Sequence, residues 1–259
     1  VEHLSARLET RPETGIRLMI AGLLGRVDYP GACELLVALI EDLDPLELRP
    51  RYAQETLESA LAAHLLQSPD ALDVLWQSGF DAPAERLVLF ARAVAATRTS
   101  AGVELLASWI DMHPEADGEL LTQIGSVVGE GGLAVPPAAL AAVRSKVLAE
   151  EPEVRRSAII AAGRLRDEAV FDDLVHMLQD QPELVVASAR WSLQAIAGVD
   201  LGTDGQAWLD WREREQAWLT EQAPALLEDL ASEIPGVVVA AVAEGLRHPF
   251  HRHLVAEAL

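Results

Sequence analysis

One short segment of the sequence collects side chains that are hard ligands for metal ions. Asp111, His113, Glu115 and Asp117 alternate over seven positions, and carboxylates of this kind favour calcium or magnesium. Their spacing is not that of a calcium-binding loop, and Pro114 is typical of a junction between two helices. We therefore predict a connection between helices here and no metal site.

The histidines and the single cysteine are the next groups that could do chemistry. His248 and His251 can share a helical face, but His253 points away from it, and zinc needs three or four ligands around one centre. His176 has no serine or cysteine nucleophile nearby in the sequence. Cys33 lies among apolar residues and has no second cysteine to pair with. We predict a structural role at the end of the solenoid for the three C-terminal histidines, a partly buried surface position for His176 and a core position for Cys33.

A glycine-rich run is the remaining chemical motif. Gly129-Glu130-Gly131-Gly132 has the composition of a phosphate-binding loop, but it lacks a preceding strand and the Lys-Ser/Thr pair that would hold phosphate and magnesium. We predict that it connects two helices. Because no segment supplies a catalytic constellation, we assign no catalytic residue and no cofactor, and we expect a protein that is not an enzyme.

The charge balance bears on the kind of partner. The 259 residues include 20 basic and 41 acidic side chains, which gives a net charge of −21. Binding to the phosphate backbone of nucleic acids needs clustered cations, so we expect a protein or peptide with a basic surface and no nucleic acid. The chain has 19 arginines, one lysine and no asparagine, which is typical of GC-rich coding in a bacterium, with adaptation to high salt as an alternative.

The composition also predicts the class of fold and the compartment. Half of the residues are hydrophobic but only 5% are aromatic, and a chain dominated by alanine and leucine favours helices. The longest uncharged stretches, 131–143 and 234–243, are shorter than the roughly 20 apolar residues that span a bilayer. We therefore expect a cytoplasmic protein that does not bind membranes, and export after removal of a leader stays open.

Prolines recur at the heads of segments with helical periodicity. They are separated by 38, 33, 31, 38, 30 and 53 residues, and they are Pro12, Pro50, Pro83, Pro114, Pro152, Pro182 and Pro235. A period in the thirties is typical of solenoids, in which each helix pair buries its apolar face by stacking on its neighbours. The spacing predicts an all-α solenoid of about seven helix pairs.

The clearest of these units resembles a known family. Residues 152–167 read Pro-Glu-Val-Arg-Arg-Ser-Ala-Ile-Ile-Ala-Ala-Gly-Arg-Leu-Arg-Asp, and a second helix is expected from about Ala169 to Leu178. The first of these segments resembles the first helix of a HEAT repeat, in particular the short HEAT-like type of bilin lyases and many bacterial scaffold proteins. Weaker echoes occur at 21–25, 193–196 and 243–246. The resemblance implies a right-handed α-α superhelix that forms a single domain over residues 1–259.

The longest interval between prolines predicts an insertion. Removing residues 199–219 leaves 53 − 21 = 32 residues, which restores the period. The inserted segment reads as a loop that ends at an N-cap, Asp204, followed by a helix with Trp208, Trp211 and Trp218 on roughly one face. We expect the tryptophans to pack on the flank of the solenoid, and the alternative is that they form a partner-binding patch.

The second helices carry a repeated acidic position. When they are aligned on their apolar pairs, an acid precedes each pair, and these acids are Glu34, Asp73, Glu104 and Asp173. Seven residues later come Glu41, Asp111 and Asp180, whereas Phe80 breaks the pattern in the second unit. The HEAT resemblance implies that second helices line a concave surface, so these acids would form an acidic groove. A solvated face without a ligand is the alternative, and Arg144 with Lys146 divides the stripe into two patches.

Two classes of function follow from the sequence. The resemblance and the charge favour a scaffold or adaptor whose acidic groove binds a basic protein or peptide. An immunity or inhibitor protein for a cationic toxin fits the same charge. The alternative class is an accessory or lyase-type enzyme, because some HEAT-like relatives are bilin lyases; others are alkylpurine DNA glycosylases, which would need a basic groove.

Overall fold

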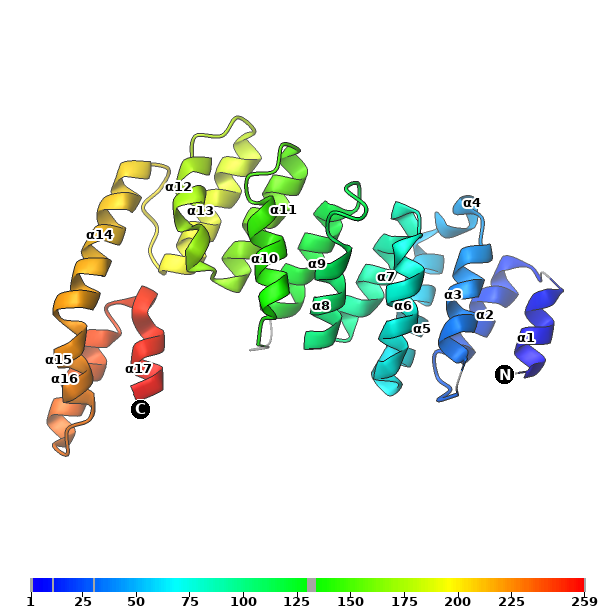
Figure 1. The fold of residues 1–259 in the computed structure, drawn as a ribbon, viewed down its shortest axis with the longest axis horizontal. Helices are drawn as coiled ribbons and strands as arrows, with labels where there is room; N and C mark the ends of the chain where they lie inside the picture. Colours follow the sequence, from blue (N-terminus) through cyan, green and yellow to red (C-terminus); the bar gives the residue numbers. More distant parts are fainter. Residues whose placement is uncertain (1, 11, 30, 130–133, 259) are drawn as a thin grey trace. The chain divides into compact units, whose positions relative to one another are not determined.

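The chain is helical throughout the part that the structure describes. The computed structural model describes residues 2–10, 12–29, 31–129 and 134–258, and these residues form helices and no strand (Figure 1). They divide into two compact units, Val1–Ala161 and Ala162–Leu259, which are described separately here. The all-α prediction is confirmed, whereas the single domain stays a prediction. None of the helices in the described residues has the length and apolar character needed to cross a membrane.

Unit 1 contains most of the helix pairs. Its helices are α1 (Glu2–Glu9), α2 (Thr14–Leu24), α3 (Ala32–Asp42), α4 (Pro45–Leu48), α5 (Arg51–Gln67), η1 (Pro69–Ala71), α6 (Leu72–Phe80), α7 (Ala84–Ala96), α8 (Ser100–Trp109), α9 (Asp117–Gly129) and α10 (Pro137–Lys146). Helix α11 (Pro152–Leu165) continues across the boundary between the units.

Unit 2 holds the C-terminal helices. They are η2 (Glu168–Val170), α12 (Phe171–Met177), α13 (Glu183–Ala197), α14 (Gly205–Glu221), α15 (Ala223–Leu230), α16 (Pro235–Gly245), η3 (Pro249–His251) and α17 (Arg252–Ala258). The expected second helix at 169–178 is present as η2 followed by α12. Helix α14 forms most of the predicted insertion.

Five of the seven recurring prolines mark helix starts, as predicted, whereas Pro12 and Pro114 precede the first residues of α2 and α9 by two and three positions. Pro152 and Pro235 are the first residues of α11 and α16, while Pro50, Pro83 and Pro182 immediately precede α5, α7 and α13. Proline fits these places because its missing N–H would have no partner within the helix. The acidic residue Asp204 is the N-cap of α14, where its side chain accepts hydrogen bonds from the next backbone amides, also as predicted.

The helices of unit 1 stack in two layers. In the first-helix layer, α2 packs on α5, α5 on α7 and α7 on α9; in the second-helix layer, α3 packs on α6, α6 on α8 and α8 on α10 (Figure 1). Buried Leu36, Leu57, Leu75, Phe90 and Leu106 fill the space between the layers. This stacking is what brings acids from separate segments of the sequence onto neighbouring helices.

The first-helix layer is packed closely enough to require glycine at one position. A Cβ added to Gly25 would lie 2.3 Å from the backbone carbonyl oxygen of Ala60, so α2 and α5 approach each other without room for a side chain. The glycine-rich run that the sequence placed between helices begins inside α9 at Gly129, and its other residues lie outside those described.

Candidate functional site

Three neighbouring second helices expose acids without any basic residue of their own. Helices α3, α6 and α8 contain no lysine, arginine or histidine. Besides Asp42, which pairs with Arg17, their exposed acids are Glu34 in the first turn of α3, Glu41 near its end, Asp73 in the first turn of α6, and Glu104 in α8. We call these four residues the acidic face. Because α6 packs on both α3 and α8, one part of unit 1 brings them together.

The carboxylates of the acidic face are not neutralised by ion pairs. Within the described residues, no lysine, arginine or histidine forms an ion pair with Glu34, Glu41, Asp73 or Glu104. The negative charge of an exposed carboxylate without an ion-pair partner is not compensated by the protein. Several such carboxylates on one surface produce a negative electrostatic potential that attracts a positively charged group. The four side chains are exposed, and their role in binding a partner stays a prediction.

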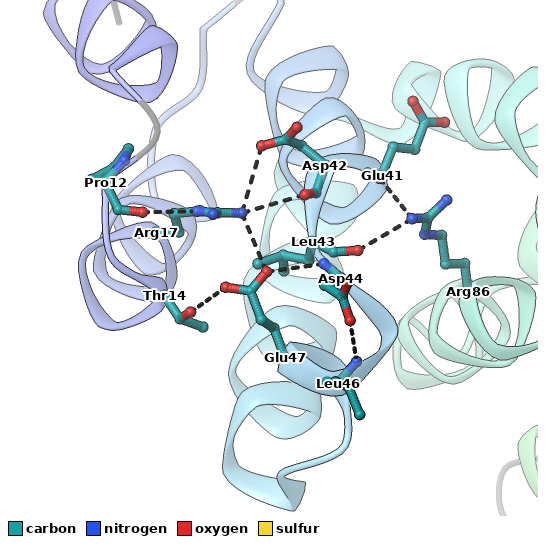
Figure 2. Close-up of polar contacts among 10 residues, drawn as sticks. All are labelled: Pro12, Thr14, Arg17, Glu41, Asp42, Leu43, Asp44, Leu46, Glu47 and Arg86. Carbon is teal, nitrogen blue, oxygen red and sulfur yellow. Dashed lines mark hydrogen bonds and ion pairs between the residues drawn. The ribbon is translucent and has the colours of Figure 1, made fainter.

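The C-terminal end of α3 is fixed by arginines from the first-helix layer. Arg86 in α7 donates from Nη2 to the carbonyl oxygens of Glu41, at 2.6 Å, and Leu43, at 3.2 Å. Figure 2 shows the carboxylate of Glu41 directed away from this guanidinium. The arginine thus satisfies backbone carbonyls at the negative end of a helix and leaves the Glu41 side chain exposed.

A second arginine holds the same helix end from the other side. Arg17 in α2 donates from Nε to the carbonyl oxygen of Pro12 at 2.9 Å, and its Nη1 lies 3.5 Å from Asp42 Oδ2 and 3.6 Å from Glu47 Oε2 (Figure 2). Glu47 accepts hydrogen bonds from the Thr14 hydroxyl and from the Asp44 amide. These bonds, with a smaller contribution from Arg17, hold the pKa of Glu47 below its usual range.

A hollow lies beside the acidic face, where α3 and α6 end. Its volume is about 300 Å³, and it is lined by Glu41, Gln77, Ser78, Asp81, Ala82, Pro83 and Arg86. Arg86 is the cation of this lining, and its guanidinium is bound to the two backbone carbonyls of the α3 end. The acids therefore border a polar depression that is large enough for a side chain.

Asp111 does not belong to the acidic face, which corrects the sequence prediction. It lies beyond the end of α8, with a φ of 71°, and its Oδ1 is 2.5 Å from Nζ of Lys146. The same Nζ is 2.6 Å from the buried Asp117. Burial opposes the charge on Lys146, but hydrogen bonds to the two carboxylates outweigh this effect and raise its pKa. Asp111 is thus held in a structural ion-pair network.

The suspected metal ligands around Asp111 have other roles. His113 Nε2 lies 3.2 Å from the carbonyl oxygen of Gly79 and 3.1 Å from that of Phe80, so this ring fixes the end of α6. No group of three or more potential ligands that could hold a metal ion occurs in the described residues.

The acids of unit 2 are arranged differently from those of unit 1. Asp173 lies half-buried in the first turn of α12, and Asp180 follows the end of that helix and accepts a hydrogen bond from the Gln181 amide at 2.6 Å. A pair of acids seven residues apart on one helix therefore occurs in α3, but not in α8 or α12. The sequence pattern overestimated the stripe because it extended the helices past their ends.

The tryptophans of α14 are buried. The expectation that they pack against the protein is confirmed, and the alternative that they form a partner-binding patch is wrong. Trp208 and Trp211 pack against Phe171 and Phe250, with ring centroids 5.4 to 6.2 Å apart. Trp208 also donates from Nε1 to the carbonyl oxygen of Gly202 at 3.0 Å. Trp218 is equally buried. A partner cannot reach these rings without unfolding part of unit 2.

The C-terminal histidines pack against the same helix. His248 stacks on Trp218 with centroids 3.8 Å apart, and its Nδ1 is 3.1 Å from Glu215 Oε2. His251 is buried, with Nε2 placed 3.3 Å from the backbone carbonyl of Glu215. The predicted structural role is confirmed for both, whereas the side chain of His253 lies outside the described residues.

Cys33 is buried in α3, as predicted. Its side chain is 2% exposed, and burial, together with the neighbouring charge of Glu34, raises the pKa of the thiol to about 12. The thiol is therefore an inert part of the core.

Two residues beside the acidic face were missed by the sequence reasoning. Trp76 and Phe80 on α6 are 50% and 57% exposed. They follow Asp73 by three and seven positions, and this spacing places all three on one helical face. The spacing of the two aromatic residues is visible in the sequence, where Phe80 interrupts the acidic pattern.

The comparison with known proteins agrees with this architecture. Residues 103–194 match the family model of HEAT repeats, and the matched segment begins in unit 1 and ends in unit 2. The match supports HEAT repeats in general rather than the bilin-lyase type. No curated protein matches the chain. HEAT repeats generally mediate protein–protein interactions and are generally not catalytic. With helix pairs stacked in chain order and a family match over residues 103–194, this segment of the chain is similar to HEAT repeats.

Proposed function

We propose that this protein is a non-enzymatic interaction scaffold whose acidic face binds a basic protein or peptide. The observation that carries the proposal is the absence of any basic residue in α3, α6 and α8, three helices that pack side by side and expose Glu34, Glu41, Asp73 and Glu104. Like charges that lie together without counter-charges repel one another, so an arriving cation lowers the energy of the whole face.

The distribution of arginines within unit 1 supports this proposal. Arg86 binds the carbonyl oxygens of Glu41 and Leu43 at the C-terminal end of α3, and Arg17 pairs with Asp42, the last residue of α3, and with Glu47 of α4. The chain thus supplies donors next to the acidic face without neutralising the face itself. This arrangement fits a surface that receives its cations from a partner.

A titration with a defined basic probe tests the proposal. The probe is a synthetic peptide that alternates lysine with glycine, and its binding is measured by calorimetry at low salt. Reversing the charge of three acids on the face, in the variant Glu34→Lys/Asp73→Lys/Glu104→Lys, should weaken binding about tenfold or more. Raising the salt to about 0.5 M should also weaken it, because the Debye length falls to about 4 Å.

A control variant separates this face from the overall negative charge. Glu183, Glu213 and Glu228 are exposed acids of unit 2, and reversing all three changes the net charge by the same amount. This control should bind the peptide with an affinity within about threefold of wild type. Equal weakening by the two variants would show attraction to the total charge alone, and the proposal would then be wrong.

A further inference from the structure

Helix α6 exposes two large aromatic side chains between the acids of its neighbours. Trp76 and Phe80 are half exposed, lie four residues apart and share a helical face with Asp73. Aromatic side chains of this size are usually buried, and exposing them leaves much apolar area in water. In unit 1, α6 packs between α3 and α8, which carry Glu34, Glu41 and Glu104.

We propose that Trp76 and Phe80 are a binding site for arginine side chains of the basic partner. This inference rests on the proposed function and specifies which cation the face prefers. A guanidinium group can stack flat on an aromatic ring while its edge donates hydrogen bonds, and here the carboxylate of Asp73 lies one helical turn before Trp76. Arginine is also more weakly hydrated than lysine, so it loses less on contact with an apolar ring.

The charges around the rings argue against a purely apolar occupant. An apolar segment that covered Trp76 and Phe80 would remove water from neighbouring carboxylates without offering them hydrogen bonds, which is costly. Arg86 is the cation that lines the adjacent hollow, and its Nη2 is engaged by the Glu41 and Leu43 carbonyls. Aromatic rings bordered by unpaired carboxylates thus match a guanidinium group in both apolar contact and charge.

A second exposed tryptophan provides a matched control. Trp191 on α13 is 45% exposed, close to the exposure of Trp76. Its neighbour Arg190 pairs with Asp200 at 2.6 Å, so the acid near this ring already has a cation. Trp191 therefore offers an exposed aromatic surface next to an arginine that is already paired with an acid.

The test compares two peptides of equal length and charge, one alternating arginine with glycine and the other lysine with glycine. Wild-type protein should bind the arginine peptide about threefold or more tightly than the lysine peptide. In the variant Trp76→Leu/Phe80→Leu this preference should disappear, while salt-dependent binding of both peptides remains. The variant Trp191→Leu should keep the preference unchanged.

Fluorescence quenching gives an independent readout of contact with Trp76. Of the six tryptophans, Trp76 and Trp191 are exposed, so the variant Trp191→Phe leaves Trp76 as the ring accessible to acrylamide. The arginine peptide should reduce quenching in this variant.

Persistence of the arginine preference in Trp76→Leu/Phe80→Leu, or unchanged quenching in the presence of bound peptide, would overturn the inference and leave the proposed function intact. If both peptides bound the charge-reversed variant of the acidic face and the control variant of unit 2 with equal affinity, the proposed function would instead be wrong.

Discussion

The two helix layers of unit 1 use charge in opposite ways. In the first-helix layer, Arg92 of α7 joins Glu119 of α9, at 2.8 Å, and Glu58 of α5, at 3.5 Å, so one cation links three successive helices. In the second-helix layer, the four acids of the acidic face have no such cation, whereas Asp42 at the end of α3 pairs with Arg17. Arg92 therefore helps to hold the first layer together, and the contrast supports the proposal that the acids of the second layer bind a partner. Stability and binding should therefore respond to different substitutions.

The largest effect on stability is expected where the first-helix layer is tightest. Gly25→Ala places a Cβ against the backbone of Ala60, which cannot move away as a flexible side chain would, and we expect a loss of about 3 kcal/mol of unfolding free energy. Urea unfolding of the purified variant measures this loss.

Gly22 in the same helix serves as the control. A Cβ added to Gly22 meets no atom within 4 Å, so Gly22→Ala should stabilise the protein by about 0.5–1 kcal/mol through better helix propensity. Similar free energies for the two variants would show that the close approach of α2 and α5 does not limit the packing.

The next effect concerns the cation that joins the first-helix layer. Arg92→Met keeps the apolar stem but leaves Glu58 and Glu119 without their cation, and we expect destabilisation of about 1–2 kcal/mol. Arg51 is the control, because its pair with Glu55 within α5 is fully on the surface, with the arginine 89% exposed. Arg51→Met should change thermal stability by no more than about 0.5 kcal/mol. A larger loss for Arg51→Met than for Arg92→Met would contradict the linking role of Arg92.

Removing charge from the acidic face should change the free energy of unfolding less than Arg92→Met does. The triple variant Glu34→Gln/Asp73→Asn/Glu104→Gln loses two favourable acids in first turns but also relieves repulsion, so each change should stay within about 0.5 kcal/mol. Its affinity for the lysine-glycine peptide should nevertheless fall. A variant that unfolds easily, or one that binds as well as wild type, would remove the proposed distinction between the layers.

The smallest expected effect is a difference in pH dependence between two glutamates of the packed region. Hydrogen bonds lower the pKa of Glu47, so its contribution to stability is present above about pH 4.3, the unfolded value, and is lost as the pH falls through the folded pKa. Burial is the main cause that raises the pKa of Glu58, so its contribution is present below the unfolded pKa and is lost as the pH rises through the folded pKa.

Urea unfolding as a function of pH separates the two glutamates. Glu47→Gln should reduce the loss of stability toward acid pH, whereas Glu58→Gln should reduce the loss toward neutral pH. Identical pH profiles for the two variants would mean that the hydrogen bonds of Glu47 and the burial of Glu58 do not govern their titration.

Local signals in the sequence predicted the fold well. A proline needs a position whose N–H is free, and Asp204 needs exposed backbone amides, so both identify helix starts without knowledge of distant residues. The exposure of Glu34 and Asp73 followed in the same way from the apolar pairs beside them. These features depend on neighbours within one or two helical turns.

The contacts around the site that the sequence did not predict involve residues far apart along the chain. Asp111 is captured by Lys146, which is 35 positions further along the chain. Trp208 and Trp211 are covered by Phe171 and Phe250, which come from other helices. Periodicity within one helix cannot reveal such contacts, because they arise only when the helices stack.

The buried thiol of Cys33 makes it possible to measure how often α3 detaches from the core. The thiol lies inside α3, next to Glu34, and with a pKa of about 12 it cannot react while the helix is packed. Labelling of this single thiol in native protein should therefore proceed only through transient opening of α3, and the labelling rate relative to that of unfolded protein gives the free energy of that opening. A bound basic peptide that spans α3 and α6 should slow the labelling. The decrease in the labelling rate of Cys33 then measures how much a bound partner stabilises the packing of α3.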